Sequence, residues 1–194
     1  MTASNPKSVK IRCQWCGTDP LYVAYHDKEW GVPVRDDSTM FEFLLLETFQ
    51  AGLSWITILR KRENFRKAFD NFDYTKIAEY DQSKIDALLK NKGIIRNKLK
   101  VYSAIVNARA FMAIQQEFGS FTHYIWGFVN HAPIQNQWQH EQAIPATSKQ
   151  SDALSQDLKK RGFKFVGSTV IYALMQATGM INDHVESCFR YNAV

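Results

Sequence analysis

Hydrophobic residues recur along this chain every three to four positions, in stretches separated by short polar or glycine-containing breaks. This spacing is typical of amphipathic helices, and capping residues and glycines mark where the helices begin and end. Strict alternation, which would indicate half-buried strands, is scarce apart from a short extended piece at residues 163–166. The pattern therefore predicts an all-α fold. The predicted helices span residues 40–51, 57–69, 73–80, 83–91, 97–118, 121–129, 151–161 and 169–178.

Local signals sharpen several of these boundaries. Thr39 and Glu42 have the spacing of a capping box, and Ser83 is expected to cap a helix. Residues 131–149 contain two prolines and are predicted to be mostly loop. The polar residues 1–11 are predicted to form a disordered leader, and residues 12–194 are long enough to form one domain with its own core.

A basic helical hairpin is predicted over about residues 83–118. Its turn contains Gly93, which permits a positive φ angle, and the helix that follows presents free amide groups suited to a phosphate. The alternative is an ordinary helical hairpin with a solvated basic face. The surrounding cations are Lys92, Arg96, Lys98 and Lys100, and the candidate phosphate contacts are Gly93, Arg96 and Lys98.

Composition and charge narrow the class of protein. The 24 Lys and Arg exceed the 19 Asp and Glu, giving a net charge of +5. This excess favours a polyanionic partner, but a basic enzyme acting on small molecules is compatible with it. The chain shows no signal-peptide pattern and no apolar stretch of membrane-spanning length. Three cysteines do not suggest a disulfide framework, so we expect a reduced, cytoplasmic protein.

The cysteines and one histidine have the spacing of metal ligands. Cys13 and Cys16 form a C-x-x-C pair, and His184 and Cys188 would share one face of a helix. Spacing alone selects these four residues as a tetrahedral zinc site, closed and therefore structural. The alternative is three buried, inert thiols and a hydrogen-bonded histidine.

Glu47 lies among apolar helical neighbours, Phe43, Leu44 and Ala51. An ionisable group on such a face is costly to bury unless it has a partner or a function. The alternatives are that Glu47 faces solvent or forms a structural ion pair.

Aromatic residues crowd the segment that precedes this helix. Stacked rings of this kind bind flat, cationic ligands, although core packing is the more common role of Trp and Tyr. The aromatic residues are Trp15, Tyr22, Tyr25 and Trp30, with His26, Asp27 and Glu29 among them.

Several stretches together resemble one family, the constitutive type I class of bacterial 3-methyladenine DNA glycosylases. They occur in the family's order and extend over nearly the whole chain from Arg12 onward. The stretches are Arg12–Trp15, Tyr25–Gly31, Glu47–Trp55, Gly162–Gly167 and Asn182–His184 with Cys188.

The resemblance implies a helix-hairpin-helix DNA glycosylase fold in which a zinc site joins the N- and C-terminal segments. In the zinc ligand set, the resemblance points to His26 in place of Cys16, so that the implied ligands are Cys13, His26, His184 and Cys188. It also implies a key glutamate, Glu47, and a wedge, Gly52 and Leu53, that enters the duplex where the base leaves. The implied base pocket consists of Trp15, Tyr22, Tyr25 and Trp55, supported by Trp30.

The implied activity is that of a monofunctional, monomeric DNA-repair hydrolase. It would flip 3-methyladenine out of double-stranded DNA and cleave the N-glycosidic bond, leaving an abasic site for base excision repair. The aspartate that many relatives carry after the hairpin has no counterpart, since no acid lies between Arg96 and Glu117. Two other functions remain open: a zinc-stapled module that binds nucleic acid without catalysis, and a hydrolase of small N-glycosides.

Overall fold

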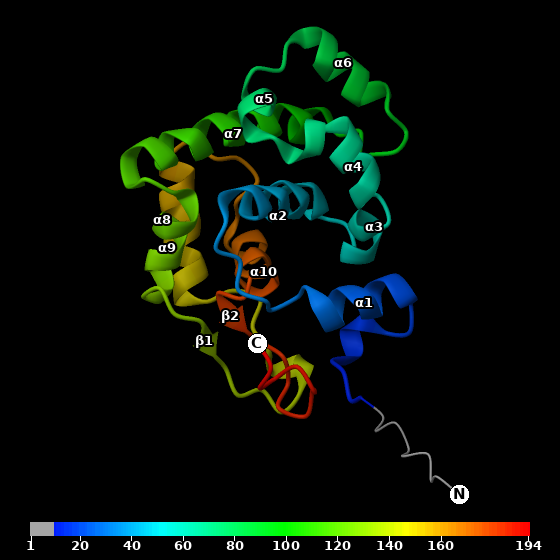
Figure 1. Ribbon diagram of the computed structural model, residues 1–194, viewed down its shortest axis with the longest axis vertical. Helices are drawn as coiled ribbons and strands as arrows, with labels where there is room; N and C mark the ends of the chain where they lie inside the picture. The colour runs from blue at the N-terminus through cyan, green and yellow to red at the C-terminus, as the bar shows by residue number, and fades with distance from the viewer. Residues whose placement is uncertain (1–9) are drawn as a thin grey trace, which may run out of the picture.

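Helices form nearly all of the regular structure in the computed structural model, which describes residues 10–194 (Figure 1). The prediction of an all-α fold is therefore confirmed. In the described residues the helices are α1 (Pro20–Lys28), α2 (Asp37–Gln50), α3 (Trp55–Leu59), α4 (Arg62–Ala68), α5 (Tyr74–Ala78), α6 (Gln82–Lys90), α7 (Lys98–Phe118), α8 (Phe121–Trp126), α9 (Lys149–Lys160) and α10 (Ser168–Ala177). The predicted leader falls mainly on residues 1–9, which lie outside the described part.

Helix α2 lies at the centre of the molecule, with α7 and α10 packed against it (Figure 1). Every residue from Met40 to Phe49 is buried, so this helix is enclosed on all sides instead of having one polar face. Asp36 caps it by accepting a hydrogen bond from the Thr39 amide, at 2.8 Å. The predicted capping box of Thr39 and Glu42 is therefore wrong. Glu42 instead accepts hydrogen bonds from Arg62 and Arg66 of α4.

Two other boundaries differ from the predicted ones. The single helix predicted over residues 57–69 is two helices, α3 and α4, which separate at Arg60 and Lys61. The side chain of Lys61 is used instead to bind the hairpin turn, where it donates to the carbonyls of Lys92 and Gly93. Helix α6 begins after Asp81, whose carboxylate accepts from the Lys84 amide, and Ser83 is not its cap.

Helix α1 was not predicted, although its start carries two ordinary signals. Pro20 occupies the first turn, and the Asp19 side chain accepts from the amides of Leu21 and Tyr22. Both features are typical of a helix N-terminus. The aromatic and charged residues that follow obscure the hydrophobic periodicity, because α1 presents side chains to a cavity on one side and to polar groups on the other.

A very short parallel strand pair joins the segment after α8 to the C-terminal segment. Strand β1 (Ile134–Gln135) pairs with β2 (Ile181–Asn182), which precedes His184 directly. Residues 163–166, expected to be extended, form a turn in which Phe165 has a φ angle of 57°. The Asn107 side chain holds this turn by bonding both backbone groups of Lys164. Among the described residues, no helix is long and apolar enough to cross a membrane.

Candidate active site and metal cluster

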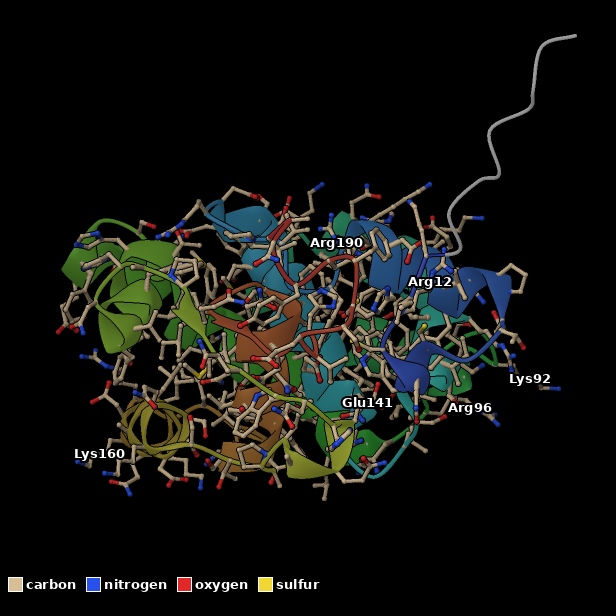
Figure 2. The ribbon with its side chains drawn as sticks, turned by 90° about the horizontal axis from the view of Figure 1, so that it is seen from below. Arg12, Lys92, Arg96, Glu141, Lys160 and Arg190 are labelled. Carbon is tan, nitrogen blue, oxygen red and sulfur yellow. The ribbon has the colours of Figure 1, made fainter. Side chains whose placement is uncertain are left out.

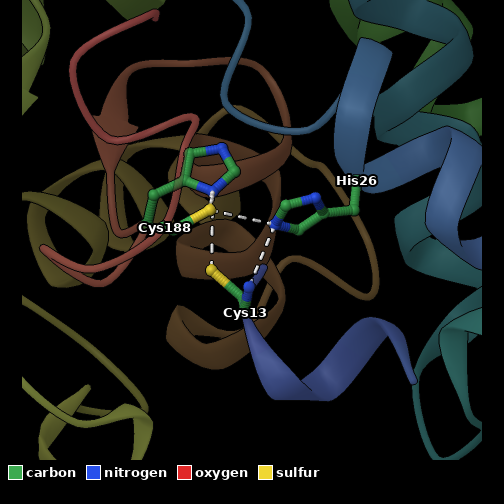
Figure 3. Close-up of side chains that lie close together, drawn as sticks. Cys13, His26 and Cys188 are labelled. Atoms are coloured by element: carbon green, nitrogen blue, oxygen red, sulfur yellow. Dashed lines mark hydrogen bonds between the residues drawn. The ribbon is translucent and has the colours of Figure 1, made fainter. Parts of the chain in front are cut away.

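Two cysteines and two histidines converge where the N- and C-terminal segments meet (Figure 3). They are Cys13, His26, His184 and Cys188, all buried, and their ligand atoms lie within 4.8 Å of one another. The Cys188 thiol is 3.5 Å from both His26 Nε2 and His184 Nδ1. Sulfur and nitrogen ligands of one tetrahedral metal ion lie about 3.6 Å apart. The four side chains are therefore spaced to hold a single metal ion in a closed site.

The outer nitrogen of each histidine is hydrogen bonded in a way that leaves the inner nitrogen for a metal. His26 Nδ1 lies 2.9 Å from the Asp27 carboxylate, and His184 Nε2 lies 3.2 Å from the Trp30 carbonyl oxygen. Partners of this kind orient metal-binding imidazoles. Arg12 donates two hydrogen bonds to Asp27 and holds the pKa of that carboxyl at about 2, so that it stays ionised.

The ligand set chosen from spacing alone is wrong in one member. Cys16 is buried but points away from the cluster, and its thiol donates to the Cys13 carbonyl oxygen at 3.1 Å. It lies in the 3-10 turn η1 (Gln14–Cys16), which directs Cys13 and Cys16 to different sides. Nor do His184 and Cys188 share a helix, because residues 183–190 form successive turns after β2. His26 reaches the cluster from the last turn of α1.

A cavity of about 190 Å³ lies beside this cluster. Its volume is below the roughly 300–1,000 Å³ typical of drug-sized ligands, so it suits a single small ring system. Helices α1, α2 and α10 form most of its wall. The lining residues are Trp15, Tyr22, Tyr25, Trp30, Glu47, Gln50, Trp55, Ile144, Ala173 and Gln176.

The aromatic rings of the wall pack against one another, edge to face around Trp15 and tilted between Tyr25 and Trp55. Trp15 contacts Tyr22 and Trp30 with ring centroids 5.0 Å apart, and Tyr25 contacts Trp55 at 5.5 Å. The Trp55 ring nitrogen is buried and has no hydrogen-bond partner in the part of the chain that the structure describes. An orphaned buried donor is unfavourable, so a ligand with an acceptor atom would suit this wall.

The cavity and the metal cluster share their supports. Tyr25 and His26 are consecutive in α1, so one side chain lines the cavity while the next enters the cluster. Trp30 lines the cavity and also packs edge-on against the His184 ring, at 4.5 Å. Trp15 follows Cys13 by two residues. A metal ion that fixes the cluster would therefore fix three aromatic residues of the cavity wall.

Glu47 is the buried acid of the cavity. Its side chain comes from the central helix α2 and is 3% exposed. Burial raises the pKa of Glu47 to about 8, and no charged or hydrogen-bonding neighbour offsets this effect. The carboxyl is therefore protonated near neutral pH in the free protein, and a cation entering the cavity would favour its ionised form.

Four cavity residues were missed in the sequence: Gln50, Ile144, Ala173 and Gln176. Gln50 lies one helical turn after Glu47, and this spacing was the available signal. Gln176 is oriented by Asp183, which accepts its amide at 2.7 Å. The same carboxylate also accepts from Tyr172, Asn136 and Trp138. No spacing rule relates these residues, which come from three separate segments.

The predicted wedge lies immediately after α2. Gly52 has a φ angle of 81°, a conformation that other residues rarely adopt, and it lets the chain turn sharply at the helix end. Leu53 is 38% exposed, and its amide donates to the Gln50 carbonyl. An apolar side chain is thus held in an exposed tight turn beside the cavity.

The hairpin departs from its predicted form at two residues. Gly93 does not have a positive φ angle, but a Cβ atom there would lie 3.0 Å from the Asn91 side chain and 3.1 Å from Asn64. Its amide donates to Asn91 and is therefore not free. Lys100, expected on the basic face, is buried and 6% exposed. Lys92, Arg96 and Lys98 are exposed, and Figure 2 shows Lys92 and Arg96 together at one end of the molecule.

Comparison with known proteins gives one consistent result. The family described as methyladenine glycosylase matches residues 15–191. DNA-3-methyladenine glycosylase 1 of Escherichia coli (strain K12) is 49% identical over 180 residues, 93% of this chain and 96% of that protein. A crystal structure of 3-methyladenine DNA glycosylase I superimposes with a TM-score of 0.90 at 50% identity, covering 92% of this chain and 98% of the other.

A third relative has been solved to explain 3-methyladenine recognition. This structure, of 3-methyladenine DNA glycosylase I from Staphylococcus aureus, has a TM-score of 0.89 and 34% identity. It covers 92% of this chain and 95% of its own. The family match over residues 15–191 includes all the cavity-lining residues and, of the cluster, His26, His184 and Cys188.

Proposed function

The chain belongs to the methyladenine glycosylase family, and from this premise we propose that it is a monofunctional DNA-3-methyladenine glycosylase. It removes 3-methyladenine from double-stranded DNA by hydrolysing the N-glycosidic bond, and the abasic site enters base excision repair. The observation that carries the proposal is the buried carboxyl of Glu47 in an aromatic cavity of base size. Because one chain holds the cavity, the wedge and the hairpin, the enzyme acts as a monomer. We place it in the bacterial cytoplasm.

Recognition rests on charge. Methylation at N3 gives the adenine of DNA a positive charge, which unmodified adenine lacks. The faces of Trp15, Tyr22, Tyr25 and Trp55 attract such a cation, and Glu47 accepts hydrogen bonds from the base edge. The cation also lowers the pKa of Glu47, so the carboxyl loses its proton as the base enters. Unmodified adenine loses the charge-dependent part of this binding.

Chemistry then requires little beyond positioning. The bond between the base and C1′ breaks, and its electrons neutralise the departing cationic base. Water attacks C1′ and loses a proton, which yields the abasic sugar. The ionised Glu47 stabilises the positive charge that develops on the sugar. Helix α7 carries no acid before Glu117, so no aspartate after the hairpin shares this task.

Access to the base depends on the surface around the cavity. Arg96 and Lys98 of the hairpin contact the DNA backbone, where the first amides of α7 lack helical acceptors. Flipping a base costs a few kcal/mol, and less for a weakly paired lesion. Leu53, presented by Gly52, fills the space that the base leaves and prevents its return.

Zinc is the metal ion that this cluster would hold. Two thiols and two imidazoles are the donor set of structural zinc sites, and the fixed outer nitrogens of His26 and His184 fit that role. With four protein ligands, a zinc ion would have no open position and would supply no chemistry to the reaction. It would join Cys13 and His26 to His184 and Cys188 and so stabilise the wall formed by Trp15, Tyr25 and Trp30.

Release of free 3-methyladenine tests the function. Folded, metal-loaded protein incubated with methylated duplex DNA should release this base, detected by chromatography, and leave abasic sites without strand breaks. Unmethylated duplex is the control, and the free 3-methyladenine nucleoside tests the small-molecule alternative. Absence of base release from the methylated duplex would instead favour a non-catalytic binding module.

The hairpin contacts predict a change in salt dependence. Replacing Arg96 and Lys98 together by Gln should reduce the slope of log K against log salt for undamaged duplex by about 2, because each phosphate contact contributes about 0.9. Fluorescence anisotropy at several salt concentrations measures it. Lys160→Gln is the matched control, since this exposed lysine lies at the opposite end of the molecule (Figure 2). An equal change of slope in both variants would show that the hairpin does not contact the DNA.

A further inference from the structure

Lys100 is a buried cation that serves no part of the mechanism above. It lies in the first turn of α7 and is 6% exposed. None of the ion pairs found in residues 10–194 contains it. Its ammonium group donates instead to two backbone carbonyls, of Phe49 at 2.7 Å and of Ala51 at 2.6 Å. Burying a lysine without a carboxylate is costly, so these two contacts are the reason for its position.

The two carbonyls belong to the end of α2. The last carbonyls of a helix have no partners within it and form the negative end of its dipole. A cation placed there satisfies both features. The turn that follows is also held by Gln50, whose side-chain amide donates to the Leu53 carbonyl at 2.8 Å. Lys100 and Gln50 together therefore fix the turn of residues 50–53.

The position of Lys100 joins two parts of the proposed DNA interface. Lys98, two residues earlier, belongs to the phosphate-binding hairpin, and the Asn97 side chain caps the Lys100 amide at 3.1 Å. The carbonyls that Lys100 binds lead directly into Gly52 and Leu53. Lys100 does not line the cavity. A single buried side chain thus connects the start of the hairpin helix to the wedge.

We infer that Lys100 is a positioning residue which holds the wedge turn against the hairpin helix, so that backbone binding places Leu53 for extrusion of the base. The inference rests on the proposed glycosylase function. The phosphates bound at the start of α7 must stay at a fixed distance from the apolar side chain that enters the duplex. If the turn were loose, Leu53 would be displaced when the base stacks back into the duplex. Of the cavity-lining residues, Gln50 alone belongs to this turn.

A comparison of duplex and single-stranded substrates tests the inference. Single-stranded DNA requires no extrusion from a base pair. At saturating protein, Lys100→Met should lower the single-turnover rate of 3-methyladenine release from duplex DNA by about 10- to 100-fold. Release from the same methylated strand without its complement should change by less than about threefold. A merely structural defect would lower both rates equally, and that result, or an unchanged duplex rate, would overturn the inference.

Further variants keep the test decisive. Lys160→Met, an exposed lysine at the opposite end of the molecule (Figure 2), should leave both rates unchanged. Leu53→Ala should reproduce the duplex-specific loss, and adding Lys100→Met to it should cause little further loss, because both act on one element. If Lys100→Met does not fold, Lys100→Gln, which keeps one donor without charge, serves in its place. Wild type that releases no base from either substrate would refute the function, whereas active wild type with an unaffected Lys100 variant refutes only the inference.

Discussion

Glu47→Gln is expected to lower the release of 3-methyladenine from methylated duplex DNA by about 10²- to 10³-fold, the usual effect of removing one group that stabilises transition-state charge. The amide retains the size of the side chain but cannot ionise. It therefore loses the attraction for the cationic base and for the sugar as its charge develops. Single-turnover release of the base measures the effect directly.

The pH dependence gives this prediction a signature. Burial raises the pKa of Glu47 to about 8, so the free enzyme is protonated at this carboxyl below that pH. Since kcat/KM reports the free enzyme, its value for wild type should rise with pH up to about 8 and then level off. The Glu47→Gln variant should show no such rise. Equal rates and equal pH profiles in wild type and Glu47→Gln would show that Glu47 is not needed for base release.

Stability provides the control for this variant. A carboxyl whose pKa is raised by folding keeps its proton in the folded state, while the unfolded chain loses it above about pH 4.5. Stability is therefore lost as the pH rises from about 4.5 to 8. Glu47→Gln removes this cost and should be more stable than wild type near pH 8, by roughly a few kcal/mol. A fall in activity accompanied by a gain in stability cannot be attributed to misfolding.

The central helix shows what the sequence can predict well. Local spacing places Glu47 among apolar neighbours but leaves a solvent-facing or ion-paired side chain open, and the family resemblance supplied its role. The boundaries of α7 were also close to those predicted, because Gly119 ends the helix with a left-handed conformation. Local periodicity and capping residues are sufficient to predict a helix whose ends are determined by its own residues.

Long-range contacts account for most of the errors. Lys61 and Lys100 were taken for a helical residue and a surface cation, but each bonds backbone carbonyls of a distant segment. Asp183 collects four donors from residues that no motif connects. Such partners are chosen by the tertiary fold, and the charge of a side chain does not reveal whether it faces water or a helix end.

The metal cluster illustrates the limit of spacing rules. They assume that both members of a pair lie on one regular element, as when His184 and Cys188 are placed on a helix. In the structure these residues lie in turns, and His26 is supplied by a third segment. The family resemblance identified His26 correctly because it encodes the whole site, whereas a C-x-x-C pair is only a local feature.

Loss of the metal is expected to have the largest effect on stability. Cys188→Ser should abolish binding of one zinc ion per chain and lower the free energy of unfolding by at least about 4 kcal/mol, a fraction of the about 10–16 kcal/mol with which zinc binds small finger domains. For a chain of this length, this corresponds to about 8–16 °C in unfolding temperature. Metal analysis and thermal unfolding, with and without a chelator, measure both quantities.

Cys16→Ser is the control that distinguishes the loss of the metal from the loss of a buried thiol. Cys16 is as buried as Cys188, but its thiol donates to a backbone carbonyl, and a serine hydroxyl can do the same. This variant should keep its zinc and nearly all of its stability. Because Trp15, Tyr25 and Trp30 are held by the segments that the metal joins, zinc-free protein should also lose base release before its helices unfold, and added zinc should restore it. If Cys188→Ser kept both metal and unfolding temperature, the cluster would be four buried side chains and the cavity wall would stand without it.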